Sequence, residues 1–403
     1  MGFAEWTAAF AALATAVQLI TTAIAAIRCR ARTKPVPPPE GAAPVTIVRP
    51  VCGVENFARE TLASSLALDY PQYRVLFCAA RADDPAVPLV RELLAAHPDA
   101  DAALLIGDDR AGPNPKLNNT IKGFDAATTD WIIMADSNVL MPHDYIQRLL
   151  ARWRPNSGVV VSLPIGARPA NFAAELECAF LNTYQARWEY VSDTLGMGFA
   201  QGKNMLFRRD ILEAAGGIRA LGADIAEDAA TTKLVRSSGR AAHLMDAPFD
   251  QPLGPRSFRE LWARQVRWAR LRRITFPLLF APELLCGCAF PLAAAVYAGA
   301  RWGVSLPATG LLLLGAWFGA EAALARCAGW HFSWRMPLAL LLRDLTLPAL
   351  WIEAWRSDAI VWRGNTVSEA KARGAGFREL SASPAYALAR RITTRYRARW
   401  LGR

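Results

Sequence analysis

Residues 131–138 read WIIMADSN, a short apolar run that ends in a carboxylate. Four further runs share its length and its apolar character: Val45–Val48, Arg74–Ala79, Ala102–Ile106 and Val159–Leu163. Stretches with helical periodicity alternate with these runs: Phe57–Leu68, Val87–His97 and Tyr145–Trp153. This order predicts an α/β fold in which helices cover a parallel sheet.

Carboxylates follow two of these predicted strands. Ligands bind beyond the carboxyl ends of the strands in such sheets, so residues at these points are candidates for a site. Asp83 and Asp84 come soon after the second run, and Asp136 ends the run that begins at Trp131. A carboxylate at the end of a buried strand needs a cation or a donor. Each one alone can equally be the cap of a turn or a helix.

Three later segments carry further polar groups. The loop GPNPKLNN at 112–119 offers Lys116, amide side chains and a helix N-terminus to a pyrophosphate, or is an ordinary Pro/Asn-rich turn. Asp228 ends the stretch IAED, where paired carboxylates can also serve the helix dipole. The stretch RQVRW at 264–268 has the pattern of a basic, aromatic helix at a bilayer surface.

The composition indicates an integral membrane protein. The 403 residues are 53% hydrophobic, with a mean hydropathy of +0.14 and a formal charge of +11. Trp6–Ile27 contains no charged residue and would reach about 33 Å as a helix, enough to cross a bilayer core of about 30 Å. A cleavable signal peptide is the alternative, but its basic end should precede the apolar run and here it follows.

The positive charge lies in two flanks. Arg28, Arg30, Arg32 and Lys34 contribute +4, residues 356–403 contribute +8, and the rest of the chain sums to −1. This distribution argues against a nucleic-acid partner and predicts flanks that lie on anionic lipid. The seven cysteines form no CxxC pair, which indicates a reduced, cytosol-facing protein. With four scattered histidines, any metal should be hard and held by oxygen.

The C-terminal half contains further membrane segments. Leu278–Ala300 and Val304–Ala325 are each long enough to span and predict a hairpin. Met336–Trp355 carries Arg343, Asp344 and two prolines, so we predict a re-entrant or interfacial segment. A third C-terminal crossing is the alternative, but it would place the basic tail on the wrong side of the membrane.

These observations predict the order of parts along the chain. The parts are an N-terminal transmembrane anchor at 1–27, a basic and proline-rich linker at 28–44, a cytosolic α/β domain at 45–255, an amphipathic interface helix at 256–277, a transmembrane hairpin at 278–325, a membrane segment at 336–355 and a basic cytosolic tail at 356–403. The Ala- and Arg-rich composition indicates a bacterial inner-membrane protein whose α/β domain faces the cytosol.

Taken in order, five motifs resemble the ceramide glucosyltransferase family, which is glycosyltransferase family 21. They are LxCxxxxDDPA at 76–86, GxNPKxNN at 112–119, DSN at 136–138, AED at 226–228 and RxxRW at 264–268. The resemblance covers about residues 5–365. It implies a GT-A nucleotide-sugar-binding domain with a Rossmann-like mixed sheet, between N- and C-terminal transmembrane helices. It also implies an inverting transfer of a hexose from a UDP-sugar to the hydroxyl of a lipid.

The resemblance assigns roles to individual residues. It gives Asp83 and Asp84 to the uridine, Lys116 to the nucleotide phosphates, and Asp136 to a Mg²⁺ or Mn²⁺ ion. Asn138 stands where the general DxD motif has its second carboxylate, so this sequence departs from that form.

The remaining assignments concern catalysis and the acceptor. The resemblance gives Asp228 the role of catalytic base, and it assigns Arg264, Arg267 and Trp268 to the motif that closes over the diphosphate. Trp268 can alternatively anchor the chain at the membrane interface. Gln201, Gly202 and Asn204 lie just upstream of Asp228 and are predicted to shape the acceptor mouth.

The identity of the substrates stays open at this point. Ceramide, diacylglycerol and a hopanoid all present one hydroxyl above apolar chains; we take ceramide first and diacylglycerol second. These residues do not distinguish UDP-glucose, UDP-galactose and UDP-glucuronate as the donor. They do not indicate the oligomeric state either. A processive polysaccharide synthase would need more crossing helices, and a non-catalytic membrane scaffold would predict eroded motifs.

Overall fold

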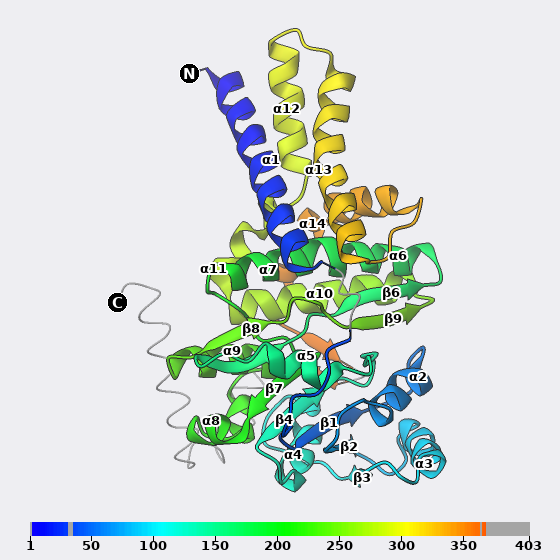
Figure 1. The fold of residues 1–403 in the computed structure, drawn as a ribbon. Coiled ribbons are helices and arrows are strands. Elements are labelled where there is room, and N and C mark those ends of the chain that lie inside the picture. The colour runs from blue at the N-terminus through cyan, green and yellow to red at the C-terminus, as the bar shows by residue number, and fades with distance from the viewer. Residues whose placement is uncertain (1, 31–34, 363–364, 368–403) are drawn as a thin grey trace. The chain divides into compact units, whose positions relative to one another are not determined.

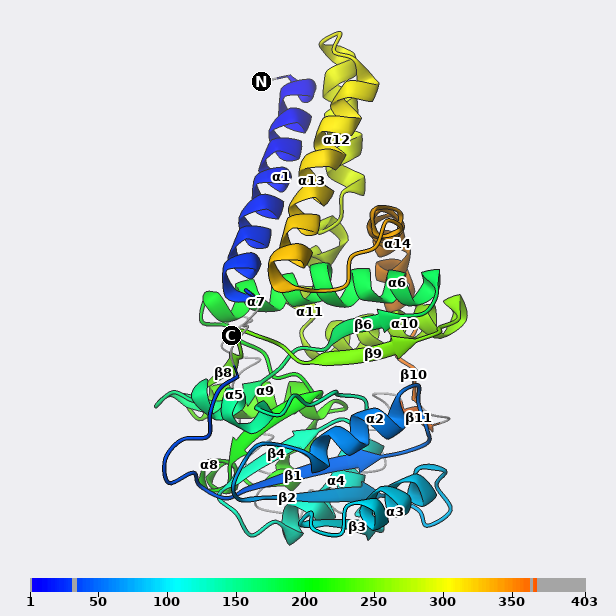
Figure 2. The same cartoon turned by 45° about the vertical axis from the view of Figure 1, so that its right-hand side comes forward.

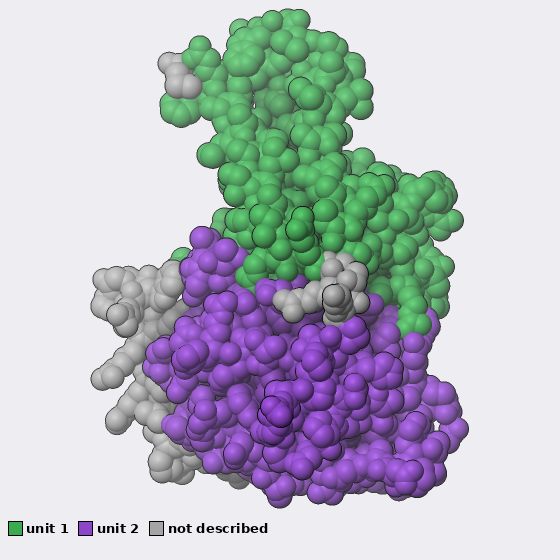
Figure 3. Space-filling model, viewed as in Figure 1, with its two compact units in different colours: residues 1–31, 165–191, 253–358 green, residues 32–164, 192–252, 359–403 purple. Residues whose placement is uncertain are grey.

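A computed structural model describes residues 2–30, 35–362 and 365–367. The chain forms two compact units, coloured separately in Figure 3. Unit 1 comprises residues 1–31, 165–191 and 253–358, and unit 2 comprises residues 32–164, 192–252 and 359–403. Of the two predicted basic flanks, Arg32, Lys34 and nearly all of the tail at 356–403 lie outside the described residues.

Unit 2 is built on a seven-stranded sheet with the strand order β3-β2-β1-β4-β7-β5-β8 (Figure 1). The strands are β1 (Val45–Val51), β2 (Tyr73–Ala79), β3 (Ala102–Ile106), β4 (Trp131–Ala135), β5 (Ser157–Val161), β7 (Asn204–Arg208) and β8 (Ala241–Leu244). The five apolar runs therefore form strands as predicted.

The sheet is mixed, not wholly parallel. β1, β2, β3 and β4 pair in parallel, but β7 runs antiparallel to both β4 and β5. The parallel sheet predicted from the alternation of elements is therefore wrong at β7, whereas the mixed sheet that the family resemblance implied is confirmed. The antiparallel direction places the start of β7 beside the end of β4, because Asn204 pairs with Ala135.

Helices connect and cover these strands. They are α2 (Ala58–Ala63), α3 (Ala86–Ala96), α4 (Pro115–Ala126), α5 (Tyr145–Ala151), α8 (Arg209–Ala214) and α9 (Glu227–Ser237), with 3₁₀ turns at η1 (Ser64–Leu66) and η3 (Ile218–Ala223). The helix predicted at Phe57–Leu68 therefore changes to a 3₁₀ turn after Ala63. A short antiparallel pair, β10 (Ile360–Trp362) and β11 (Asn365–Val367), follows late in the chain.

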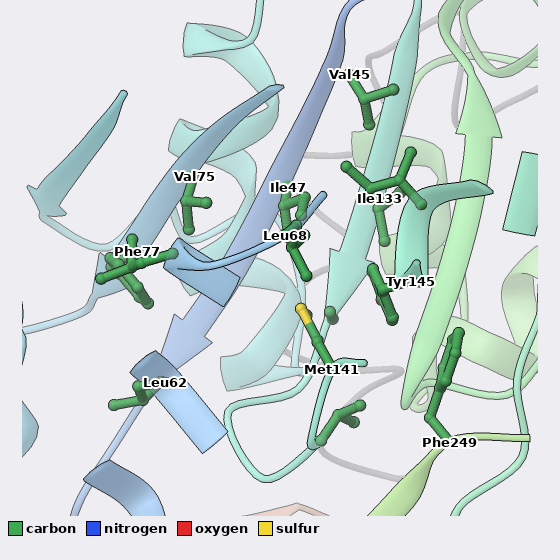
Figure 4. Packing of buried hydrophobic residues seen from close by; sticks show 14 of the residues in the cluster. Val45, Ile47, Leu62, Leu68, Val75, Phe77, Ile133, Met141, Tyr145 and Phe249 are labelled. Carbon is green, nitrogen blue, oxygen red and sulfur yellow. The ribbon is translucent and has the colours of Figure 1, made fainter. Parts of the chain in front are cut away.

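One hydrophobic cluster of unit 2 lies on one face of the sheet. Alternate residues of neighbouring strands point into it, such as Val45 and Ile47 in β1 and Val75 and Phe77 in β2 (Figure 4). On the other face, α4 packs close to the sheet at Gly123, where a Cβ atom would stand 2.5 Å from a methyl carbon of Val48.

Unit 1 is mostly helical. Its helices are α1 (Phe3–Arg28), α6 (Phe172–Cys178), the π-helical η2 (Ala179–Gln185), α7 (Ala186–Thr194), α10 (Phe258–Thr275), α11 (Pro277–Phe280), η4 (Ala281–Leu285), α12 (Ala289–Arg301), α13 (Leu306–Ala328) and α14 (Met336–Arg356). A two-stranded sheet joins β6 (Ile165–Pro169) and β9 (Asp250–Gly254).

Within the described residues, three helical segments are long and apolar enough to cross a membrane: Phe3–Arg28, Pro277–Arg301 and Leu306–Ala328. They coincide with the three apolar stretches that the sequence predicts as spans. α1, α12 and α13 lie side by side (Figures 1 and 2). The middle segment is not one regular helix, because α11 and η4 precede α12.

α14 differs from these three helices. It is one uninterrupted helix with Pro348 inside it, and it runs across the direction of α13 (Figures 1 and 2). Whether this segment re-enters the membrane, lies in the membrane interface or crosses the bilayer stays a prediction.

Candidate active site

Asp136 follows β4 directly and is the centre of a charged cluster in unit 2. Its backbone N–H donates to the carbonyl oxygen of Lys203 at 3.0 Å, which extends the β4–β7 pairing by one residue. Its Oδ1 lies 2.6 Å from Lys116 Nζ, and its Oδ2 lies 2.9 Å from Lys203 Nζ. Burial would raise the pKa of Asp136, but the charges of the two lysines outweigh burial and lower it.

Lys116 stands in the first turn of α4. The helix begins there because the Asn114 side chain accepts from the backbone N–H of Lys116 at 2.9 Å and because Pro115 occupies the first helical position. The ammonium bridges Asp136 and Glu227 Oε1, the latter at 2.7 Å, and it also donates to the Gly202 carbonyl. Burial opposes the charge, yet these two carboxylates raise the pKa of Lys116.

Glu227 and Asp228 form the first turn of α9. Glu227 Oε2 accepts from Asn114 Nδ2 at 2.6 Å, so this carboxylate ties the start of α9 to the start of α4. Asp228 has no lysine partner among the described residues, and its carboxylate accepts from the backbone N–H groups of Gly202 at 3.2 Å and Ala229 at 2.8 Å. Burial, and then the charge of Glu227, raise the pKa of Asp228 to about 6.

Two residues of this cluster were missed by sequence reasoning. Lys203 pairs with Asp136, and Glu227 was read only as a helix-dipole residue beside Asp228. A signal for Lys203 existed in the sequence, because it separates Gly202 from the apolar run that forms β7. The antiparallel direction of that run, which no local pattern indicates, decides that Lys203 faces Asp136.

Arg49 was also missed, and it holds the loop that follows β4. Its guanidinium is fully buried and donates to the carbonyl oxygens of Asp136 at 2.9 Å and Val139 at 3.1 Å, and to that of Thr61 at 2.7 Å. Burial lowers the pKa of Arg49 to about 10. An arginine inside the apolar strand VTIVRPV was the available signal.

The two aspartates after β2 are placed differently from each other. Asp84 Oδ1 accepts from the backbone N–H groups of Gly53 and Ala86, both at 2.8 Å, so it links the segments that follow β1 and β2. Asp83 is exposed and forms an ion pair with Arg81, whose hydrogen bond lowers the pKa of the Asp83 carboxyl group. Their assignment to uridine stays a prediction.

The residues predicted for an acceptor mouth separate into two environments. Gly202 lies inside the charged cluster, where a Cβ atom would stand 2.7 Å from Glu227 Oε1. Gln201 precedes it in the same loop. Asn204 is 1% exposed, and its Oδ1 accepts from the Tyr145 hydroxyl group at 2.6 Å. This placement speaks against a contact between Asn204 and an acceptor.

The RxxRW motif belongs to α10 of unit 1. Its first arginine, Arg264, donates to Glu177 Oε1 at 2.8 Å, and Glu177 is completely buried. Trp268 packs against the hydrophobic cluster of unit 1, and Arg267 lies one residue before it in the same helix. The assignment of Arg264, Arg267 and Trp268 to the diphosphate stays a prediction.

The oxygen donors near Asp136 suit a hard cation. The described residues contain no group of three His, Cys, Asp or Glu side chains that could hold a metal by themselves. Asp136 provides one carboxylate with a side chain that is 22% exposed, and Asn138 adds an amide oxygen. Mg²⁺ in proteins often takes only one or two carboxylates and completes its coordination with substrate phosphates and water. The set therefore fits a divalent ion that binds together with a diphosphate.

The cluster combines two chemical capacities. Lys116 and Lys203 supply positive charge at the end of β4, next to the N-terminus of α4, where an anion is favoured. Asp228 accepts from two backbone N–H groups and has no ion-pair partner in the part of the chain that the structure describes, so its carboxylate can accept a proton near neutral pH.

Comparison with known proteins identifies relatives along most of the chain. The family model described as glycosyl transferase family 21 matches residues 8–373. Ceramide glucosyltransferase 3 of Caenorhabditis elegans is 27% identical over 329 residues, covering 80% of this chain and 72% of the relative. The ceramide glucosyltransferase of Komagataella phaffii is 28% identical and covers 64% of this chain and 62% of the relative.

Among solved structures, the mannosyltransferase PcManGT from Pyrobaculum calidifontis, in complex with GDP-Man and Mn²⁺, has the same fold. Its TM-score is 0.50 at 20% identity, with 85% of this chain and 98% of that chain covered. At this identity the likeness concerns the fold alone.

Proposed function

The chain belongs to glycosyl transferase family 21, and we propose that it moves a hexose from a UDP-sugar to the hydroxyl group of a membrane lipid. It is a glycosyltransferase with a GT-A-like domain, and its described part contains three apolar helices long enough to span a membrane. The observation that carries the proposal is the cluster around Asp136, where two lysines stand beside Asp228, a carboxylate that has no ion-pair partner among the described residues.

The donor end of the proposal rests on charge. A nucleoside diphosphate is an anion, and Lys116 carries its ammonium at the start of α4, where backbone N–H groups add positive potential. Asp84 is proposed to contact the uridine, since it lies after β2 and is held by two backbone donors. Asp83 is its exposed neighbour.

Asp136, with Asn138 beside it, is the proposed binding position for Mg²⁺ or Mn²⁺. A bound divalent ion would stabilise the negative charge that develops on the leaving diphosphate. The chain's own lysines act in the same direction, because each can donate to a phosphate oxygen.

Asp228 is the proposed general base. The acceptor hydroxyl group gives its proton to the Asp228 carboxylate while its oxygen attacks the anomeric carbon of the sugar. The bond between that carbon and the diphosphate oxygen breaks, and UDP leaves with the bonding electrons. One displacement of this kind inverts the anomeric carbon.

The acceptor is proposed to be ceramide, with diacylglycerol as the second candidate and a hopanoid as the third. Two relatives are named ceramide glucosyltransferases, and the apolar helices support a substrate that is drawn from the bilayer. We further propose that the enzyme lies in a bacterial inner membrane with unit 2 in the cytosol, where UDP-sugars are available.

The experiment that tests the proposal is a product analysis. Purified full-length protein in lipid nanodiscs is incubated with labelled UDP-glucose, UDP-galactose or UDP-glucuronate and with ceramide, diacylglycerol or a hopanoid. Asp228→Asn protein is the matched control. We expect a labelled glycolipid from the wild type alone, and hydrolysis without lipid product in every combination would contradict the proposal.

A further inference from the structure

Lys203 occupies a fixed position opposite Asp136. The pairing of β4 with β7 matches Ala135 to Asn204, and the hydrogen bond from Asp136 N to Lys203 O continues it at 3.0 Å. The two side chains are therefore cross-strand neighbours. The register of the sheet therefore brings these two side chains into contact.

The ammonium of Lys203 contacts the first and the last residue of the DSN motif. It lies 2.9 Å from Asp136 Oδ2 and 3.0 Å from Asn138 Oδ1. The Asn138 amide nitrogen in turn donates to Glu55 Oε2 at 3.0 Å, which orients the amide oxygen toward the lysine. Asn138 thus acts as an acceptor for Lys203, at the position where the general motif has a second carboxylate.

The charges are shared unequally between the two lysines. Lys116 contacts the carboxylates of both Asp136 and Glu227. Lys203 has one carboxylate partner among the described residues, Asp136, and it shares that partner with Lys116. Its side chain is 15% exposed. Lys203 is therefore the cation of this cluster whose charge is least compensated by the protein.

We propose that Lys203 is a second diphosphate-binding residue, which adds positive charge next to Asn138, the residue that stands in place of a second carboxylate. The inference rests on the proposed UDP-sugar site. A lysine is a compact charge on a flexible stem, so its ammonium can leave the Asp136 carboxylate for a phosphate oxygen without a change in the backbone. This movement leaves Asp136 Oδ2 free for a divalent ion, while Lys116 still contacts Oδ1.

The competing explanation is that Lys203 only braces the β4–β7 pair. A brace would lower the melting temperature when removed and would affect every ligand of the domain alike. A diphosphate-binding residue would affect UDP but not uridine, which has no phosphate. Binding measurements with both ligands therefore separate the two explanations.

The test uses full-length protein and isothermal titration calorimetry with UDP and with uridine, in EDTA and in Mn²⁺. Lys203→Met should weaken UDP binding in EDTA by about ten- to a hundredfold, since one charge-assisted hydrogen bond is lost. Uridine binding should stay unchanged. The control is Lys233→Met, which removes a lysine of similar exposure that pairs with Asp224.

A rescue variant sharpens the test. Lys203→Met combined with Asn138→Asp restores a second carboxylate, so its UDP binding should recover in Mn²⁺ but not in EDTA. Equal UDP binding by wild type and Lys203→Met in EDTA, a parallel loss of uridine binding, or no wild-type binding unless Mn²⁺ is present would each overturn the inference. If the wild type binds UDP in neither condition, it is the proposed function that fails.

Discussion

The protein contains two clusters of charged residues, one in each unit, and they differ in how completely their charges are satisfied. The donor cluster of unit 2 consists of Lys116, Asp136, Lys203, Glu227 and Asp228. The helix cluster of unit 1 consists of Gln18, Arg187, Glu321, Arg343 and Asp344. Every member of the helix cluster is at most 2% exposed, whereas the Asp136 side chain is 22% exposed.

The charged side chains of the helix cluster are paired with one another. Arg343 donates to both Glu321 oxygens, at 2.7 and 2.9 Å, and to Asp344 Oδ1. Gln18 Nε2 donates to Glu321 Oε1 at 2.8 Å, and Arg187 donates to Gln18 Oε1. Two positive and two negative side chains balance, and the network joins α1, α7, α13 and α14.

This difference indicates a structural role for the helix cluster and a chemical role for the donor cluster. Charges without water or ligand access must neutralise one another, so a closed network indicates a role in packing the helices. In the donor cluster, the described residues include no ion-pair partner for Asp228, and Lys203 shares its one carboxylate partner there with Lys116. Incomplete satisfaction at a partly exposed point is what a ligand site requires. We therefore expect substitutions in the donor cluster to change activity and those in the helix cluster to change stability.

The largest effect is expected at Asp228. Asp228→Asn should lower turnover by about 100- to 10,000-fold, because a general base contributes that much to rate. UDP affinity should stay within a few-fold, since the lysines that we propose to contact the diphosphate are untouched. Single-turnover kinetics and calorimetry measure the two quantities. Near-normal turnover would remove Asp228 from the role of base.

The next largest effect tests the other half of the comparison. Arg343→Met leaves Glu321 and Asp344 buried with one cation fewer, which should cost about 3–5 kcal/mol of stability. A thermal melt in detergent measures it. Adding Glu321→Gln restores the charge balance and should recover part of the loss. An Arg343→Met protein as stable as the wild type would show that the helix cluster is not needed for packing.

A smaller effect concerns pH. The folded-state pKa of Asp228 is about 6, above the usual value of 3.8, and the base must be ionised to act. kcat/KM should therefore rise about tenfold per pH unit below 6 and level off above it. The same shift makes folding more favourable as pH falls from 6 toward 4, because in that range the folded state binds the proton and the unfolded state does not.

Glu227 provides the check on this assignment. Its charge is the second cause of the raised pKa, so Glu227→Gln should move the acid limb of the rate profile to lower pH. Because Glu227 also holds Lys116, its loss should weaken UDP binding as well. An acid limb that stays at the same pH in this variant would assign the limb to another group.

Sequence patterns predicted what local order decides. Apolar runs of the right length located five strands and three possible spans. They could do so because a buried strand or a membrane span needs a continuous apolar stretch in any fold. The five motifs led to the family because each of them is a contiguous stretch of sequence. Asp136, Lys116 and Asp228 were candidates from sequence and do lie in one cluster, through Lys116 and Gly202.

Patterns did not predict partners that are distant in the chain. Arg343 and Asp344 were noticed as charges in an apolar segment, but their network includes Glu321, Gln18 and Arg187, which no spacing connects to them. Lys203 and Arg49 were missed because their roles depend on the direction of β7 and the depth of β1. The direction of a strand and the pairing of distant residues depend on how the whole chain folds, so local sequence patterns do not predict them.

The smallest expected effect concerns the boundary between site and core, at Asn204. Tyr145→Phe removes the hydroxyl group that donates to Asn204 Oδ1 and leaves that buried oxygen without this donor. The loss should cost about 1–2 kcal/mol of stability, the usual penalty for an unpaired buried group. The KM for the lipid acceptor should not change, because Asn204 faces the interior and not the charged cluster. Thermal melts and initial rates at varied acceptor concentration measure both. A raised KM with unchanged stability would instead return Asn204 to the acceptor mouth, and it would mean that the donor cluster reaches further along β7 than its contacts indicate.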